Sequence, residues 1–182
     1  MITIEGVEVP NLISELTVEQ FDKFNNIEGN KDLDVIEKWI TKFTYLGVPE
    51  EVFDDYTMEQ FVELKQNFDV KTEVPQVKVL SIEVDGYTYE AKPQIGVKDL
   101  SLIEKKWKHD LANFASECLA ILFKRSDLSR KEHYANAHIK HKANLFKGLK
   151  AELAIPYVLD VQKVLTANAE KVVKDAKDEA TK

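Results

Sequence analysis

Three histidines lie close together in the second half of the chain, and histidine clusters can bind zinc. His133, His138 and His141 fall within nine residues, and His138 and His141 share one face of a helix at a spacing of three. No cysteine lies near them, the neighbouring acid is Glu132, and the His-Glu-x-x-His pattern of zinc proteases is absent. Because the surrounding lysines and arginines disfavour protonation, we expect neutral imidazoles on a polar helix face and no metal.

Oxygen-bearing side chains recur from residue 26 to residue 37 with the spacing of a calcium-binding loop. The ligand positions of that register fall on Asn26, Glu28, Asn30, Asp32, Asp34 and Glu37. The sixth position of such a loop needs glycine for its sharp turn, but here it is Lys31, and the glycine is displaced to Gly29. Acids at a helix start account for the same composition, so we expect helix capping here and not calcium.

The chain has one cysteine, Cys118, and it lies in the apolar run of residues 114–123. A buried thiol is more typical of such a run than a nucleophile. Gly-rich phosphate loops, Gly-x-Ser-x-Gly elbows and recognisable pairs of carboxylates are missing from the sequence. We therefore expect a protein that is not an enzyme and that needs no cofactor.

Charge is spread unevenly along the 182 residues, whose net charge is −7. Residues 1–75 carry 17 acidic and 6 basic side chains, a balance of −11, whereas residues 124–150 carry 8 basic and 2 acidic ones, a balance of +6. This asymmetry favours head-to-tail association or attraction of a polyanion, although a solvated helix face has the same composition. The candidate partner-binding residues are the charges Glu19, Glu59, Arg130, Lys131, Lys140 and Lys142.

A sequence echo marks two helix starts in the acidic part of the chain. The segments Glu15-Leu-Thr-Val-Glu-Gln-Phe21 and Asp55-Tyr-Thr-Met-Glu-Gln-Phe61 lie forty residues apart. In each, a threonine stands three residues before a glutamine, so the hydroxyl can accept from the N3 amide while the glutamine reaches back. We expect helices over residues 17–27 and 57–68, and we interpret the echo as a repeated structural start signal.

Another helix is expected between these two. It begins at about Asp32 and ends before Gly47 and Pro49, and a helical turn follows at residues 49–53. Its predicted apolar stripe is Leu33, Ile36, Ile40, Phe43 and Leu46. The predicted inner face of the helix over 57–68 is Met58, Phe61, Leu64 and Phe68. With an extended start at residues 2–9, residues 1–75 are predicted to form an acidic helical domain.

The strongest strand signal follows a linker predicted at residues 69–76. Residues 77–84 and 87–91 flank Asp85-Gly86, a dipeptide that favours the type I′ turn, so the pattern predicts a β-hairpin. Because a lone hairpin is marginally stable in water, it needs a neighbour. The candidates are the helices after Gly96 and the extended residues 2–9.

Helical patterns then extend over residues 97–109, 114–124, 129–150 and 151–176. Pro156 should kink or divide the last of these unless the helix begins just before it. The predicted fold is mainly α (α+β): a helical N-terminal domain with a duplicated helix motif, then one hairpin packed on a helical C-terminal domain of residues 76–170, and a charged tail of residues 171–182. No window approaches the roughly 18 apolar residues that a membrane span requires, so we expect no membrane partner.

The hairpin and the helices after it resemble a known group of proteins. The segments are Val84-Asp-Gly-Tyr-Thr-Tyr-Glu-Ala-Lys-Pro-Gln-Ile-Gly-Val-Lys-Asp-Leu-Ser-Leu-Ile-Glu104 and Cys118-Leu-Ala-Ile-Leu-Phe-Lys-Arg125. They resemble morphogenesis proteins of tailed bacteriophages of the tail-assembly-chaperone type, in which a similar hairpin and proline lead into similar helices. The resemblance covers residues 77–165, about half of the chain.

The resemblance implies a non-enzymatic assembly protein that binds other phage proteins, namely tail, tape-measure or neck components, in the host cytoplasm. Chaperones of this group are thought to hold such subunits soluble before they polymerise, and an apolar groove between helices would serve this role. Self-association and retention in the finished virion stay open. A different class, a nucleic-acid-binding accessory protein, would use residues 124–150, against which stand a pI of about 5.2 and the lack of a known reader motif.

Overall fold

The computed structural model describes residues 1–12, 15–69, 78–109 and 112–180. Most of the predicted linker at residues 69–76 and the last two residues of the predicted tail lie outside these ranges. The described residues form a mainly helical α+β protein with nine helices and two small antiparallel sheets. In these ranges no helix combines the length and the apolar character needed to cross a membrane.

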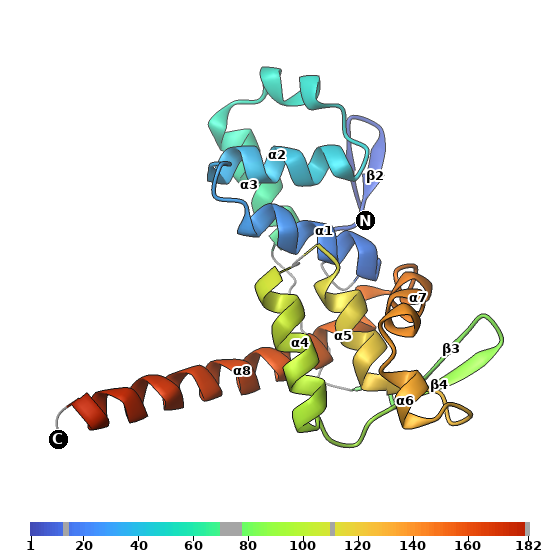
Figure 1. Ribbon diagram of the computed structural model, residues 1–182. Coiled ribbons are helices and arrows are strands. Elements are labelled where there is room, and N and C mark those ends of the chain that lie inside the picture. The colour runs from blue at the N-terminus through green and yellow to red at the C-terminus, as the bar shows by residue number, and fades with distance from the viewer. Residues whose placement is uncertain (13–14, 70–77, 110–111, 181–182) are drawn as a thin grey trace.

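The first part of the chain forms a short hairpin and then four helices. They are β1 (Ile2–Ile4), β2 (Val7–Val9), α1 (Val18–Gly29), α2 (Val35–Tyr45), the 3-10 helix η2 (Glu50–Asp55) and α3 (Met58–Asp69). The second part contains β3 (Ser81–Val84), β4 (Tyr87–Ala91), α4 (Val97–His109), α5 (Phe114–Leu122), β5 (Phe123–Lys124), α6 (Arg130–His133), α7 (Asn136–Phe146) and α8 (Ala151–Ala180). Figure 1 shows these two groups of elements on opposite sides of the molecule.

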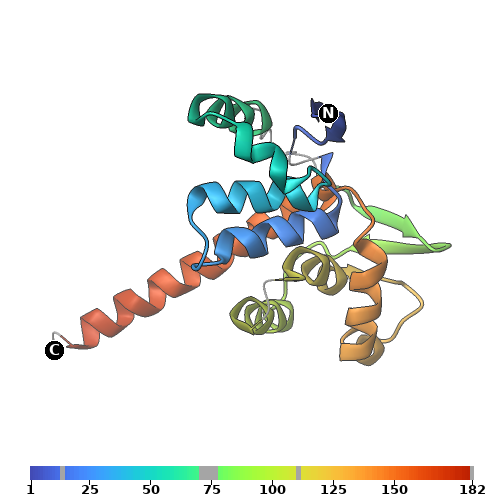
Figure 2. The same ribbon diagram turned by 90° about the horizontal axis from the view of Figure 1, so that it is seen from above.

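Two clusters of buried side chains hold the molecule together. The first cluster is rich in aromatic rings from the N-terminal elements: Phe24, Trp39, Phe43, Phe53, Phe61 and Phe68. The second surrounds α5, whose residues are all buried. Helix α8 contributes Ala151 and Ile155 to the first cluster and Tyr157 and Val158 to the second. Its C-terminal part extends away from the rest of the protein in both Figure 1 and Figure 2.

Both echoed helix starts are confirmed as capping boxes. The Thr17 hydroxyl accepts from the amide of Gln20 at 3.2 Å, and the Gln20 side chain accepts from the amide of Thr17 at 2.8 Å. Thr57 and Gln60 form the same two bonds at the same two distances. The repeated residues therefore satisfy amide groups that a helix start leaves without an intrahelical partner.

Replacing Thr57 with alanine is expected to lower the free energy of unfolding by about 1 kcal/mol, because an exposed amide of α3 loses its cap. Urea denaturation measures this change. The matched control is Thr44→Ala, since Thr44 is an exposed residue near the end of α2 and caps no helix start. Equal stability of the wild type and Thr57→Ala would show that this cap contributes nothing.

The predictions that Met58 and Ile36 face the core are wrong. Met58 is 60% exposed at the first position of α3, and Ile36 is also exposed on α2. On α2 it is Trp39 and Phe43 that are buried, and both pack edge-on against Phe68 at ring distances of 5.5 and 5.4 Å. The spacing of apolar residues on α2 is compatible with burial of either of two faces. The face that carries the rings of Trp39 and Phe43 is the one in the core. Helix α2 also begins later than predicted, after the cap Asp34.

The predicted β-hairpin is confirmed, and a third strand joins it. Asp85 and Gly86 adopt φ angles of +53° and +73°, as a type I′ turn requires. Strand β5 pairs with β4 at Ala91–Phe123 and Glu90–Lys124, although residues 123 and 124 were predicted to continue a helix. The hairpin therefore has a strand neighbour that the sequence pattern did not indicate.

The alternative pairing of this hairpin with residues 2–9 is wrong. Those residues form their own hairpin, β1–β2, around Glu5 and Gly6, whose φ angles are +45° and +84°. Gly6 tolerates this left-handed backbone because it has no Cβ atom. The two N-terminal strands thus pair with each other, and their side chains Ile4 and Val9 pack into the first cluster.

Two predictions about the later helices also change. The helix predicted over residues 129–150 is divided into α6, which Ser129 caps, and α7. Helix α8 is continuous through Pro156, the sixth residue of the helix, where the proline removes one amide donor without dividing the helix.

Candidate functional site

Helix α5 is buried along its whole length, so the polar groups at its two ends cannot rely on water. The residue before it, Asn113, makes no side-chain cap. The partners of both ends come instead from distant parts of the chain, and they include several of the charged residues singled out above.

The N-terminal end of α5 is capped by Asp22 of α1. Its carboxylate accepts from the amide of Ala115 at 2.5 Å and from the amide and hydroxyl of Ser116 at 3.0 and 2.8 Å. Burial raises the pKa of Asp22 to about 6, although these hydrogen bonds and the charge of Lys147 act to lower it. No local signal indicated this role, because Asp22 lies 93 residues before Ala115.

The C-terminal end of α5 is capped by Lys142 and His133. The Lys142 ammonium lies against the carbonyls of Ala120 and Phe123, at 3.0 Å from the second, and 3.1 Å from Nδ1 of His133. Nε2 of His133 lies 3.0 Å from the Ile121 carbonyl and donates to it. This arrangement gives each ammonium hydrogen an acceptor and requires a neutral His133 whose proton is on Nε2.

Burial sets the protonation of this pair. It lowers the pKa of Lys142 to about 7, with a further contribution from the charge of Lys92. It lowers the pKa of His133 to about 3, helped by the neighbouring Lys142. Neutral imidazoles were predicted, and this is confirmed for His133 and agrees with the lowered pKa of His138. A polar helix face was expected at these histidines, but the His133 side chain is buried.

Lys142 was a candidate partner-binding residue, but in the structure its side chain is not at the surface. The side chain is fully buried, and its ammonium donates to the carbonyls of Ala120 and Phe123 at the end of α5. A lysine near the C-terminal end of a helix stabilises the negative end of the dipole and satisfies its last carbonyls. The charge that the sequence assigned to a surface is therefore part of the core.

A second polar network lies beside this end of α5. Asp99 is buried, and it accepts from Lys92 Nζ at 2.6 Å, from the Tyr134 hydroxyl at 2.8 Å and from the amide of Gly96 at 2.9 Å. Burial raises the pKa of Asp99, but these bonds outweigh it and hold the pKa below its usual value. The amide of Lys92 donates to the Leu122 carbonyl at 2.9 Å, which satisfies another group at the end of α5.

The other candidate residues stay near the surface. Arg130 and Lys131 are exposed on α6 and Lys140 is exposed on α7. Glu19 is exposed, and its carboxylate lies 3.9 Å from the ammonium of Lys147. Other bases of the segment 124–150 bond within the chain: Arg125 to Asp127, and Lys150 to the carbonyl of Glu15. The basic segment thus offers less free positive charge than its sequence suggests.

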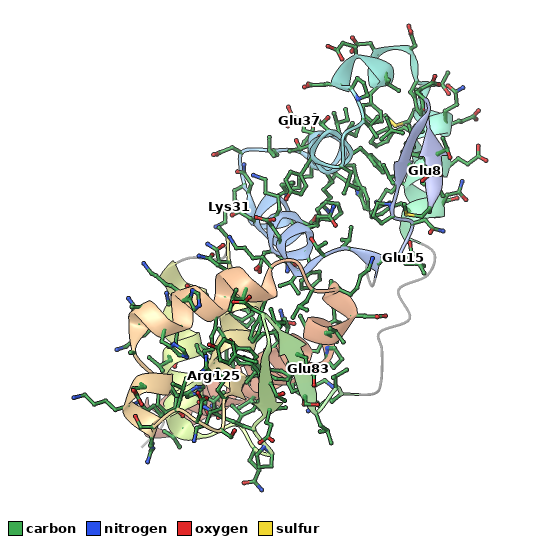
Figure 3. The ribbon with its side chains drawn as sticks, turned by 90° about the vertical axis from the view of Figure 1, so that its right-hand side faces the viewer. Glu8, Glu15, Lys31, Glu37, Glu83 and Arg125 are labelled. Carbon is green, nitrogen blue, oxygen red and sulfur yellow. The ribbon has the colours of Figure 1, made fainter. Side chains whose placement is uncertain are left out.

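Glu59 belongs to a larger acidic surface. The exposed acids of η2 and α3 are Glu50, Glu51, Asp54, Asp55, Glu59 and Glu63, and no base occurs from residue 50 to residue 63. Figure 3 shows further acids, Glu8, Glu15 and Glu37, on this half of the molecule, whereas Arg125 and Glu83 lie on the other half. We call the six acids of η2 and α3 the acidic face.

The residues of the proposed calcium register serve as caps and ion-pair partners. Asp34 and Glu37 form the capping box of α2, which confirms the capping interpretation. Glu28 accepts from Lys42 at 2.7 Å, and the Asn30 side chain accepts from the amide of Asp32 at 3.0 Å. Among the described residues, no group of three or more histidines, cysteines or acids is arranged to hold a metal ion.

Cys118 lies in the middle of α5, where it is buried. Burial raises the pKa of its thiol above the usual value, so the thiolate is disfavoured. The prediction of a buried thiol is confirmed.

A hollow of about 360 Å³ lies between α1, α2 and α3. Its apolar lining is Phe21, Phe24, Val35, Trp39 and Phe68. Lys42, Lys65 and Glu28 add charge, and the Lys65 ammonium lies 5.5 Å from the Trp39 ring. We call this hollow the three-helix groove. A second hollow of about 430 Å³, which Glu37 and Tyr45 help to line, lies on another side of α2.

Comparison of the chain with protein-family models, with curated proteins and with solved structures finds no match. The function proposed below therefore rests on the residues, hollows and charges of this chain and on the resemblance of residues 77–165.

Proposed function

We propose that this protein is a non-enzymatic assembly factor of a tailed bacteriophage and that it binds other phage proteins in the manner of a tail-assembly chaperone. The observation that carries the proposal is the three-helix groove, an aromatic hollow open at the surface of the N-terminal helices. Grooves of this kind accept the apolar face of a helix or an extended segment. The partner is a tail, tape-measure or neck protein with an exposed apolar segment.

Exposed apolar side chains of α2 support this proposal. Val35, which lines the groove, is 64% exposed, and Ile36 and Tyr45 of the same helix are exposed as well. Exposed apolar groups that gather on one helix are typical of protein-binding surfaces. The acidic face lies on α3 and η2 of the same half of the molecule, and it favours partners with basic segments.

The arrangement of the two buried clusters supports a division of the chain into domains. We propose an acidic helical domain of residues 1–75, a hairpin-plus-helices domain of residues 76–170 and a charged tail of residues 171–182. Helix α8 packs against both clusters and so links the two domains.

Val35→Asp is expected to weaken partner binding by about tenfold or more, because a carboxylate would be desolvated in the three-helix groove. The test is co-purification of the tagged protein with the products of the neighbouring tail, tape-measure and neck genes. Val97→Asp is the matched control, since Val97 is also an exposed valine at the first position of a helix, α4. Aspartate is favourable at both helix starts, so neither change should disturb folding.

Two results would refute the proposal. One is a wild-type protein that binds none of these gene products. The other is equal binding by the wild type and Val35→Asp. Mass spectrometry of purified particles then separates a transient chaperone from a component retained in the virion, because only the second is recovered in stoichiometric amounts.

A further inference from the structure

Basic side chains from three parts of the chain gather around Tyr134, the residue that follows α6. The ammonium of Lys92 lies 4.4 Å from the centre of the Tyr134 ring, and that of Lys98 on α4 lies 4.1 Å from it. Burial lowers the pKa of Lys92, and the positive charge of Arg130 on α6 lowers it further, so Arg130 lies close to this group as well. We call Lys92, Lys98, Arg130 and the exposed Lys131 the basic cluster.

The basic cluster carries an excess of positive charge. Two acids lie among its bases, and each has a partner: Asp99 accepts from Lys92, and Glu132 accepts from the amide that begins α6. The other three bases of the cluster are exposed, and none of the described acids forms an ion pair with them. Four bases and two acids leave a formal charge of +2. The cluster therefore attracts an anionic surface.

The acidic face of η2 and α3 has the complementary composition. Its six acids are exposed, have a formal charge of −6 and form no ion pair with a described base. Exposed apolar side chains stand beside two of them: Met58, next to Glu59, is 60% exposed, and Val62, next to Glu63, is 43% exposed. Exposed apolar groups rimmed by charges are typical of a protein-binding surface.

The acidic face and the basic cluster cannot meet within one molecule. Figure 1 shows η2 at the top of the molecule and α6 near the bottom, with α1 and α5 between them. A contact between the two surfaces therefore requires a second copy of the chain. Because this contact joins unlike surfaces, each copy keeps one free surface, and further copies can add to it.

We propose that copies of this protein associate head to tail in solution, with the acidic face of one copy on the basic cluster of the next. A second copy fits the acidic face better than a small ion does, because a protein surface also covers Met58 and Val62. A second copy fits the basic cluster better than a nucleic acid does, since a chain of net charge −7 repels a polyanion at long range.

This inference does not depend on the proposed function. Lys65 and Phe68, which line the three-helix groove, lie on a different side of α3 from Glu59 and Glu63. A partner in the groove therefore leaves the acidic face free. The two ideas also have different readouts, because self-association is measured on the pure protein and partner binding needs other phage proteins.

Sedimentation equilibrium of the purified full chain measures this association. At about 50 mM salt, the weight-average mass is expected to rise above that of the monomer as protein concentration increases. The monomer mass is 20.9 kDa. At about 0.5 M salt the mass should return to this value, because salt screens exposed charges. A wild type that stays monomeric at about 100 μM and low salt, or whose association is unaffected by salt, would overturn the inference.

Reversal of charge identifies the two surfaces. In the face variant, four of the six acids become lysine, which changes the charge of the face to +2: Glu51→Lys, Asp55→Lys, Glu59→Lys and Glu63→Lys. In the cluster variant, Lys98→Glu and Arg130→Glu change the charge of the cluster to −2. Each variant alone is expected to associate at least about tenfold more weakly than the wild type, because like charges then face each other.

An equimolar mixture of the two variants should regain association, because the positive face of one then meets the negative cluster of the other. The control, Glu83→Lys with Glu170→Lys, changes two exposed acids outside both surfaces and should associate as the wild type does. Circular dichroism verifies that each variant is folded. A mixture that associates no better than either variant alone would contradict the pairing. So would a monomeric wild type whose basic cluster binds a DNA duplex instead.

Discussion

Replacement of Lys142 with methionine is expected to lower the free energy of unfolding by about 3 kcal/mol or more. Methionine fills a similar volume, but it leaves the carbonyls of Ala120 and Phe123 and Nδ1 of His133 without their donor. Each buried acceptor that is left without a donor costs about 1–3 kcal/mol, since it is neither solvated nor paired. The effect should thus be larger than that of any surface charge in this chain.

Urea denaturation at about pH 6 measures this effect. Lys142, whose pKa is lowered to about 7, carries its proton under this condition. Lys140→Met is the matched control, because Lys140 is two residues away on α7 and is exposed. It should change the free energy of unfolding by no more than about 0.5 kcal/mol. If the two variants were equally stable, Lys142 would not be the cap of α5.

Asp22→Ala is expected to be the second most damaging of these changes, with a loss of about 2–3 kcal/mol at neutral pH. The substitution leaves the amides of Ala115 and Ser116 without an acceptor at a buried helix end. It also removes a negative charge from the positive end of α5. Asp54→Ala is the control, because Asp54 is an exposed acid of η2, and it should have little effect in the same denaturation experiment.

The loss caused by Asp22→Ala should depend on pH in a defined direction. Burial raises the pKa of Asp22 from 3.8 in the unfolded chain to about 6, so between these values the folded protein binds the proton more tightly. The stability contributed by this titration is complete below about pH 4 and is lost as pH rises through about 6. The difference between wild type and Asp22→Ala should therefore be larger at pH 4 than at pH 7, by about 1–3 kcal/mol. Equal differences at both pH values would contradict the raised pKa.

Interactions that span only a few residues could be predicted from the sequence. The caps at Thr17 and Thr57 depend on a spacing of three residues, and the turn at Asp85-Gly86 depends on two adjacent ones. The bounds of α4, Val97–His109, were predicted as observed. Each of these signals depends on residues that are close together in the sequence, so no knowledge of distant contacts was needed.

Side-chain placement was less predictable where two faces of a helix are both apolar. Ile36 and Met58 fit the helical spacing of a core, but the aromatic rings of Trp39, Phe43 and Phe68 exclude them from it. Residues 123 and 124 continue an apolar helical run, but pairing with β4 turns them into a strand. In each case the outcome depends on which distant surface is available, and spacing alone does not contain that information.

The sequence by itself determined where most helices and the hairpin turn at Asp85-Gly86 form, and it determined that the charge of the chain is divided between an acidic and a basic segment. Only the tertiary structure decided what the charges do. It buried Lys142 and Asp22 at the two ends of α5, and it brought Lys92 and Lys98 together at the Tyr134 ring. The physical reason is that a helix removed from water must find partners for its terminal groups, and those partners lie far away in the sequence.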